Sequence, residues 1–230
     1  MRPSLTAQVR AIVLKDLRRE LRTREITTTT VSFSIMLLVL FAFGFYRNDM
    51  DVAPLIYPGI LWISILFTGT LAISRAFDIE RQGGCLRALA LVPGTENSLF
   101  IAKFGVNLLF MATFELVLIP LLTIMFDVPL VDRKLELFAL VAGVSVGFSA
   151  MGTLVAAMMV HNQLRDVMLP ILLYPMSIPL FVGGVKATTM LLANGPSPEV
   201  TGWVQAIVAA DAIYVALAWG LFRWVLSAIE

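Results

Sequence analysis

The sequence predicts an all-α membrane protein with six transmembrane helices. Of its 230 residues, 59% are hydrophobic and 14% are charged, whereas roughly a quarter of the residues of a soluble domain are charged. A soluble fold of this size could not bury so much apolar surface in one core. We therefore exclude a water-soluble enzyme.

Residues 1–26 precede the first long apolar run and carry seven Lys or Arg side chains. Apolar residues recur here at helical spacing, namely Leu5, Val9, Ile12, Val13, Leu17 and Leu21. This pattern predicts an amphipathic helix in the membrane interface, with arginines facing anionic lipid or a cytoplasmic partner. The alternative is a lead-in segment with no specific role. We expect no cleavable signal peptide, which would place a short apolar stretch directly after a charged start.

Six apolar runs follow, and each approaches or exceeds the roughly 20 residues that a spanning helix needs. We expect them at about residues 27–46, 53–77, 99–126, 136–160, 167–185 and 203–226. Residues 27–230 would then form a single transmembrane domain with short connections. If the N-terminus is cytoplasmic, the inner segments hold thirteen Lys or Arg and the outer segments hold four. The positive-inside rule therefore predicts that both termini are cytoplasmic.

The connection between the second and third spans, residues 78–98, has its own helix signal. Two glycines and a Pro-Gly pair bound a run with an apolar side: Gly83, Gly84, Leu86, Leu89, Leu91, Pro93 and Gly94. Such a run predicts a two-turn helix across the cytoplasmic face, suited to docking into a partner. The alternative is a plain solvated connector.

The fifth span contains Pro170, Pro175 and Pro179, followed by Gly183-Gly184. Proline removes helical hydrogen bonds, and lipid tolerates this where neighbouring groups satisfy the freed carbonyls. We expect the segment to face protein or a cavity, either as a kinked packing helix or as a moving gate. Residues 186–202 should form a turn-rich outer loop.

Glu115 in the third span and Asp211 in the sixth lie inside apolar runs. A charge at the bilayer centre costs about 2.5 to 3.5 kcal/mol on insertion scales, so both side chains should face the bundle interior. They could line a substrate or partner surface in the outer half. Alternatively, each could be a neutral acid that bonds a Ser, a Thr or a backbone carbonyl and joins two helices. In the fourth span, a small-residue face around Gly147 and Gly152 predicts close helix packing.

We find no hydrolase, zinc-protease or phosphate-loop motif, and therefore expect no catalytic residues. The single histidine, His161, and the single cysteine, Cys85, exclude a multi-histidine metal site and an internal disulfide. His161 could supply at most one haem ligand, and we interpret it as an ordinary interfacial residue. Any ATP hydrolysis must take place in another subunit.

Several short motifs, in their order and spacing, resemble the CcmB family, the membrane subunit of the haem-exporter ABC transporter of cytochrome c maturation. They are Pro58-Gly59-Ile60-Leu61-Trp62, Arg75-Ala76-Phe77, Gly84-Cys85-Leu86, Leu89-Ala90-Leu91-Val92-Pro93, Lys103 and Tyr174-Pro175-Met176-Ser177-Ile178-Pro179-Leu180. The resemblance covers nearly the whole chain. It implies an ABC-2 type permease fold in a bacterial inner membrane, paired with a separate cytoplasmic ATPase.

The resemblance also implies that the loop after the second span is a coupling helix that docks in a groove of the ATPase. The docking residues would be Phe77, Asp78, Gly84, Leu86, Arg87, Leu89 and Pro93. Arg87 departs from the family, in which an acidic residue often occupies this place. Its charge partner on the ATPase would therefore be exchanged or absent.

The implied partners are a CcmA-like ATPase, a haem-handling CcmC-like protein, a small CcmD-like subunit and, indirectly, a CcmE-like haem chaperone. The chain alone would bind no cofactor and no nucleic acid, haem would be the cargo of the complex, and ATP would bind in the partner subunit. ATP hydrolysis would drive haem transfer or release of the haem-loaded chaperone. Two other functions stay open: a permease for a lipid, polysaccharide or drug, and a non-transporting membrane scaffold.

Overall fold

The computed structural model describes residues 4–45, 53–83, 96–128, 133–160 and 162–227, with the backbone alone at 53, 54, 78–83, 134, 226 and 227. The helices of this part are α1 (Leu5–Thr23), α2 (Glu25–Phe45), α3 (Ala53–Gly83), α5 (Glu96–Met125), α6 (Lys134–Met158), α7 (Arg165–Asn194) and α8 (Pro198–Ser227). Six of them, all except α1, are long and apolar enough to cross a membrane. The predicted all-α architecture with six spans is confirmed.

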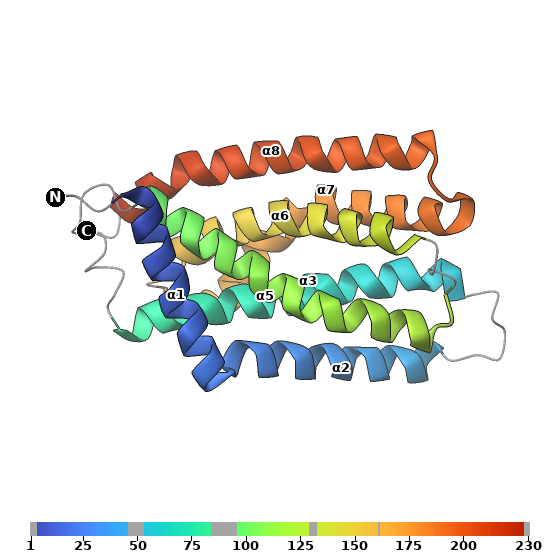
Figure 1. Ribbon diagram of the computed structural model, residues 1–230, viewed down its shortest axis with the longest axis horizontal. Coiled ribbons are helices and arrows are strands. Elements are labelled where there is room, and N and C mark those ends of the chain that lie inside the picture. The colour runs from blue at the N-terminus through green and yellow to red at the C-terminus, as the bar shows by residue number, and fades with distance from the viewer. Residues whose placement is uncertain (1–3, 46–52, 84–95, 129–132, 161, 228–230) are drawn as a thin grey trace.

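The six long helices run along one axis, and α1 lies across α5 at one end of the bundle (Figure 1). We call this end, which also holds the last turns of α3 and α8, the α1 end. Helices α2 and α8 lie at opposite edges in this view, whereas α3 and α6 are the most deeply buried spans. Each of α5, α7 and α8 has 30 residues and is therefore about 45 Å long, more than a hydrocarbon core requires.

Small residues allow the central helices to approach closely, as the sequence predicted for the fourth span. A Cβ atom added to Gly152 of α6 would overlap Ile73 of α3, and one added to Gly147 would overlap Asp211 of α8. In the same way, a Cβ atom at Gly184 of α7 would lie 2.7 Å from the indole ring of Trp62. The Cβ position of Gly147 also lies 2.8 Å from Leu180 of α7, so Gly147 and Gly152 together let α6 pack on α3, α7 and α8 at once.

Trp62 lies deep in the second span because its ring fills the space that a side chain at Gly184 would occupy. Its indole Nε1 donates a hydrogen bond to Thr188 Oγ1 at 3.0 Å, and Phe181 packs edge-on against the ring with centroids 5.8 Å apart. The buried indole N–H is therefore satisfied inside the bundle.

The fifth span differs from its prediction at its C-terminal end. Helix α7 continues through Gly183 and Gly184 to Asn194, and α8 begins at Pro198. The predicted loop of residues 186–202 is therefore reduced to residues 195–197. The glycine pair does not end the helix, because it serves as a packing surface and because backbone in lipid must bond to itself. The helix ends instead at Gly195, whose φ of 75° is left-handed.

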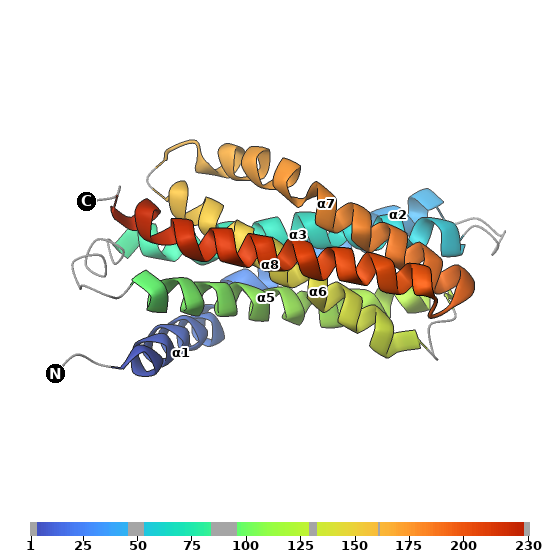
Figure 2. The same ribbon diagram turned by 90° about the horizontal axis from the view of Figure 1, so that it is seen from above.

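The prolines of α7 do not share one environment. Pro170 is half-buried, whereas Pro175 and Pro179 are exposed, so within this chain the segment meets protein through Pro170 and through the side away from the other two prolines. The opposite face, with Leu173 and Leu180, is buried. Helix α7 bends along its length (Figure 2). Within the proline stretch the carbonyl of Met176 accepts a hydrogen bond of 2.6 Å from the hydroxyl of Tyr214 on α8.

Helix α1 is seated on α5 by a partly polar face. Ile12, Asp16 and Glu20 are buried, while Leu5 and Leu21 at the ends of the predicted apolar stripe are exposed. The Glu20 carboxylate accepts hydrogen bonds from the backbone N–H groups of residues 26 and 27, at 3.3 and 2.7 Å, and so caps the start of α2. The turn between the two helices is thereby fixed to α1.

Candidate functional site

Three buried side chains from three helices meet at the α1 end. Lys103 Nζ of α5 lies 2.8 Å from Asp16 Oδ2 of α1 and 5.6 Å from the ring centroid of Phe77 on α3. Their relative exposures are 1%, 5% and 0%, so the ion pair and the cation–π contact are shielded from solvent. We call Asp16, Phe77 and Lys103 the α1-end junction. It joins α1, α3 and α5 where α3 leads into the predicted coupling loop.

The structure describes only some of the predicted docking residues. Phe77 is fully buried against Lys103, so in this chain it supports the junction and does not present a docking surface. Asp78 lies in α3, with the backbone alone described. The other docking residues, Gly84, Leu86, Arg87, Leu89 and Pro93, lie outside the described residues, as do Cys85 and His161.

A second connection at the α1 end joins α3 to α7. Arg165 is the first residue of α7 and is 1% exposed. Its guanidinium donates a hydrogen bond of 3.1 Å to the carbonyl oxygen of Ser74 on α3. The next residue, Asp166, accepts a hydrogen bond of 3.3 Å from the Ser74 hydroxyl. The end of α3 is thus bonded to α7 on one side and packs against α5 on the other.

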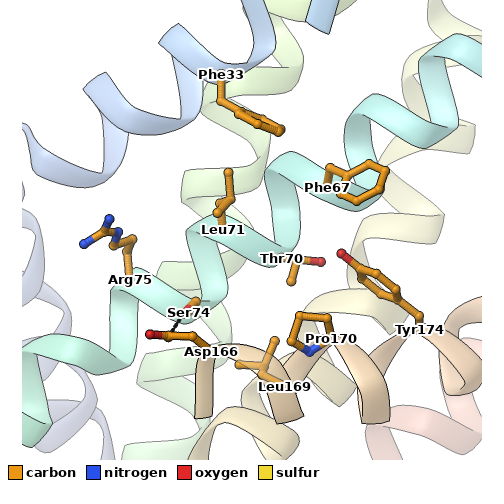
Figure 3. Close-up of a pocket in the computed structure, with 10 residues that line it drawn as sticks. All are labelled: Phe33, Phe67, Thr70, Leu71, Ser74, Arg75, Asp166, Leu169, Pro170 and Tyr174. Atoms are coloured by element: carbon orange, nitrogen blue, oxygen red, sulfur yellow. Dashed lines mark hydrogen bonds between the residues drawn. The ribbon is translucent and has the colours of Figure 1, made fainter. Parts of the chain in front are cut away.

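A groove of about 280 Å³ opens beside this connection, with α3 at its base and α2 and α7 at its sides (Figure 3). Its lining is formed by Phe33, Phe67, Thr70, Leu71, Ser74, Arg75, Asp166, Leu169, Pro170 and Tyr174. Arg75 and Asp166 lie at one end in Figure 3, and the rings of Phe67 and Tyr174 lie at the other. The groove therefore has a charged end and an aromatic end.

The two intramembrane carboxyl groups occupy different contacts. Glu115 Oε1 of α5 accepts a hydrogen bond of 2.5 Å from Ser145 Oγ of α6, and both residues are buried. This is the kind of interhelical bond that the helix-joining alternative describes. Asp211 of α8 is 8% exposed and lies against the backbone of Gly147 on α6. The two groups contact α6 two residues apart, at Ser145 from α5 and at Gly147 from α8.

Sequence analysis missed the buried charges of the α1 end. Asp16 and Glu20 lie on the buried face of α1, where the predicted amphipathic helix would have apolar residues. Lys103 was noted only as part of the family resemblance. Gln8, Ile12, Asp16 and Glu20 follow a spacing of four and mark one face of α1. A lysine at position 103 inside an apolar run also requires a partner, and this requirement was the available signal.

Within the described residues, no three His, Cys, Asp or Glu side chains gather as metal ligands. Several polar groups of the bundle are paired across helices and join elements, as in the contacts of Asp16, Ser74 and Glu115. The described part of the chain therefore offers helix junctions and a groove, and its described side chains form no metal-binding constellation.

Comparison with known proteins agrees with this architecture. The family described as CcmB protein matches residues 7–222. The heme exporter protein B of Pseudomonas aeruginosa is 24% identical over 188 residues, which are 82% of this chain and 83% of that protein. The proteins of the same name from Bradyrhizobium diazoefficiens and Rhodobacter capsulatus are also 24% identical, over 80% and 77% of this chain and 82% and 81% of theirs. This multi-pass membrane protein belongs to the CcmB family.

Proposed function

We propose that the chain is the membrane subunit of a haem exporter in a bacterial inner membrane, driven by ATP hydrolysis in a separate subunit. The observation that carries this proposal is the similarity, over about four fifths of the chain, to proteins named heme exporter protein B. The six spans supply the membrane part of such a transporter. The absence of a nucleotide-binding motif from the sequence supports the proposal that a partner hydrolyses ATP.

We further propose that the α1 end faces the cytoplasm. Basic residues gather at this end, among them Arg10, Arg18, Arg19, Arg22, Arg75 and Arg223. The described basic residues toward the opposite end are Arg133, Lys134 and Lys186. The positive-inside rule supports this orientation, in which the connection that follows α3 would be cytoplasmic and accessible to an ATPase.

The α1-end junction would transmit the movement of the ATPase to the spans. Docking at residues 84–95 acts on α3, which ends at Gly83. Phe77 passes this displacement to Lys103 on α5, and the bond from Arg165 to Ser74 passes it to α7. Packed interfaces of this kind shift between discrete arrangements and do not deform continuously. The proline bend of α7, with Pro170, Pro175 and Pro179, would be the element that moves, and Glu115 and Asp211 mark the bundle interior that it reaches.

The haem-handling chemistry belongs to partners in this proposal. With His161 as its single histidine, the chain could offer at most one axial imidazole to haem. A CcmC-like protein with a CcmD-like subunit would hold the haem, a CcmE-like chaperone would receive it, and a CcmA-like ATPase would bind the loop.

The docking assignment is tested by co-purification. Leu86→Ala combined with Leu89→Ala, or deletion of residues 86–91, should abolish recovery of the ATPase subunit with the tagged chain. Leu135→Ala, at an exposed leucine of α6 near the opposite end, is the matched control and should leave recovery unchanged. Undiminished association of the ATPase with the deletion variant would contradict the docking assignment.

A further inference from the structure

The groove of Figure 3 has a charged end and an aromatic end, and the proposed function assigns no ligand to it. Helices α2 and α7 both pack on α3 and leave a strip of α3 between them. Arg75 lies two residues before the end of the apolar span Leu55–Phe77, and Asp166 is the second residue of α7. Both charges therefore lie at the depth of lipid headgroups on the α1 side.

The other end of the groove lies at the depth of acyl chains. Phe67 precedes Arg75 by eight residues on α3, a rise of about 12 Å along a helix. Its ring meets that of Tyr174 edge-on, with centroids 6.0 Å apart, and Phe33 of α2 lines the opposite wall. An occupant must therefore place a polar head beside Arg75 and an apolar body against the aromatic rings.

The positive and negative charges at the charged end of the groove balance. The lining holds one basic and one acidic side chain, Arg75 and Asp166. Arg75 lies 3.7 Å from Glu25 of α2, and Asp166 lies 3.7 Å from the buried Arg165. A ligand with two negative charges would be attracted and repelled in similar measure. A zwitterionic head, with a phosphate and an ammonium a few bonds apart, is complementary to Arg75 on α3 and Asp166 on α7 together.

Both groups are open to a ligand. The side chain of Asp166 is 82% exposed and that of Arg75 is 45% exposed, and their charge contacts are at the long distance of 3.7 Å. A primary ammonium carries three N–H donors for the Asp166 carboxylate, whereas a trimethylated ammonium carries none. The charged end of the groove therefore distinguishes an ethanolamine head from a choline head.

We infer that this groove binds one phospholipid with a phosphoethanolamine head from the leaflet on the α1 side. Its phosphate bonds to Arg75, its ammonium bonds to Asp166, and the beginning of one acyl chain lies along Leu71 toward Phe33 and Phe67. A volume of about 280 Å³ suits a headgroup and the first part of a chain, with the remainder in the bilayer. Bound lipid would also fill the space between α7 and α2, beside the half-buried Pro170.

The test is lipid retention by the full-length chain. The protein is reconstituted into nanodiscs of equimolar phosphatidylethanolamine, phosphatidylcholine and phosphatidylglycerol, and native mass spectrometry identifies the lipids that remain bound. We expect phosphatidylethanolamine to be retained over each competitor by about three-fold, a ratio typical of exposed charge contacts. Asp166→Asn should remove the preference over phosphatidylcholine, and Arg75→Gln should lower retention of all three lipids.

Arg223→Gln, at an exposed arginine near the α1 end of α8, is the matched control and should behave like the unchanged chain. If Arg75→Gln fails to yield a monodisperse protein, Leu71→Trp keeps every charge and fills the groove, and it should displace the retained lipid. Equal retention of the three lipids would overturn the inference. A preference for phosphatidylglycerol, a preference unchanged in Asp166→Asn, or retention unchanged in Leu71→Trp would also overturn it.

Discussion

The ammonium group of Lys103 on α5 lies 2.8 Å from the carboxylate of Asp16 on α1, and both side chains are buried. This pair joins the N-terminal helix to the third span at the α1 end of the bundle. Removal of one member of a buried pair leaves an uncompensated charge, whereas replacement of both by apolar residues is often neutral. The relationship therefore makes a specific prediction about single and double variants.

Asp16→Leu should lower the free energy of unfolding by about 3 kcal/mol, because Lys103 loses its buried carboxylate partner. Lys103→Met should cost less, because Lys15 still lies 3.2 Å from the Asp16 carboxylate. The double variant should recover most of this loss. Thermal unfolding of the purified chain in mild detergent, followed by helical circular dichroism, measures the effect. Losses that simply add in the double variant would contradict the pairing.

The glycines at helix contacts should not tolerate a methyl group. Gly184→Ala places Cβ 2.7 Å from the rigid indole of Trp62, and such overpacking costs about 1 to 3 kcal/mol. Gly105→Ala on α5 is the matched control, because no atom lies within 4 Å of its Cβ position. The unfolding midpoint should fall for the first variant and hold or rise for the second. Equal midpoints would refute the close approach of α7 to Trp62.

Glu115→Gln should be nearly silent in stability and in haem delivery, because the amide oxygen can still accept the hydrogen bond from Ser145. Glu115→Leu removes the acceptor and should cost about 1 to 3 kcal/mol. Membrane levels and cytochrome c assembly in cells that carry each variant measure both effects. Loss of assembly by Glu115→Gln at normal membrane levels would assign the carboxyl group a role beyond the joining of α5 to α6.

The exposed prolines of α7 test its proposed movement. Pro175→Ala should leave the unfolding midpoint unchanged or higher, because alanine restores a helical hydrogen bond, but it should slow ATP-dependent haem release by straightening the bend. Pro120→Ala is the control, because Pro120 is also exposed within a spanning helix, α5. An unchanged release rate for Pro175→Ala would contradict the proposed movement and would mean that the bend serves helix packing alone.

Much of the fold could be predicted because long apolar runs in a membrane have few alternatives to a spanning helix. The same argument explains the error at Gly183 and Gly184, which end helices in water but provide a surface for Trp62 and Ile207 here. The pairing of Lys103 with Asp16 joins positions 87 residues apart. No local periodicity predicts such a contact, although the cost of an unpaired buried lysine indicates that a partner exists.

The groove could not be predicted from the sequence either, since its walls come from three helices, α2, α3 and α7. Arg75 and Pro170 were noted separately, one for its resemblance to the family and one as a helix kink. Their common lining of a single space depends on helix packing, which the apolar pattern of each span does not encode.

The most direct test of the central claim is affinity purification of the tagged chain from its native membrane in mild detergent. All co-purifying subunits are identified, and the Soret absorbance of haem is recorded with and without ATP, and again with an ATPase variant that cannot hydrolyse ATP. We predict recovery of an ATPase with haem-handling proteins, and loss of haem or of the chaperone that requires hydrolysis. Recovery of an ATPase without any haem protein would contradict haem as the cargo. Recovery of no ATPase would contradict the assignment as a transporter subunit and favour a membrane scaffold.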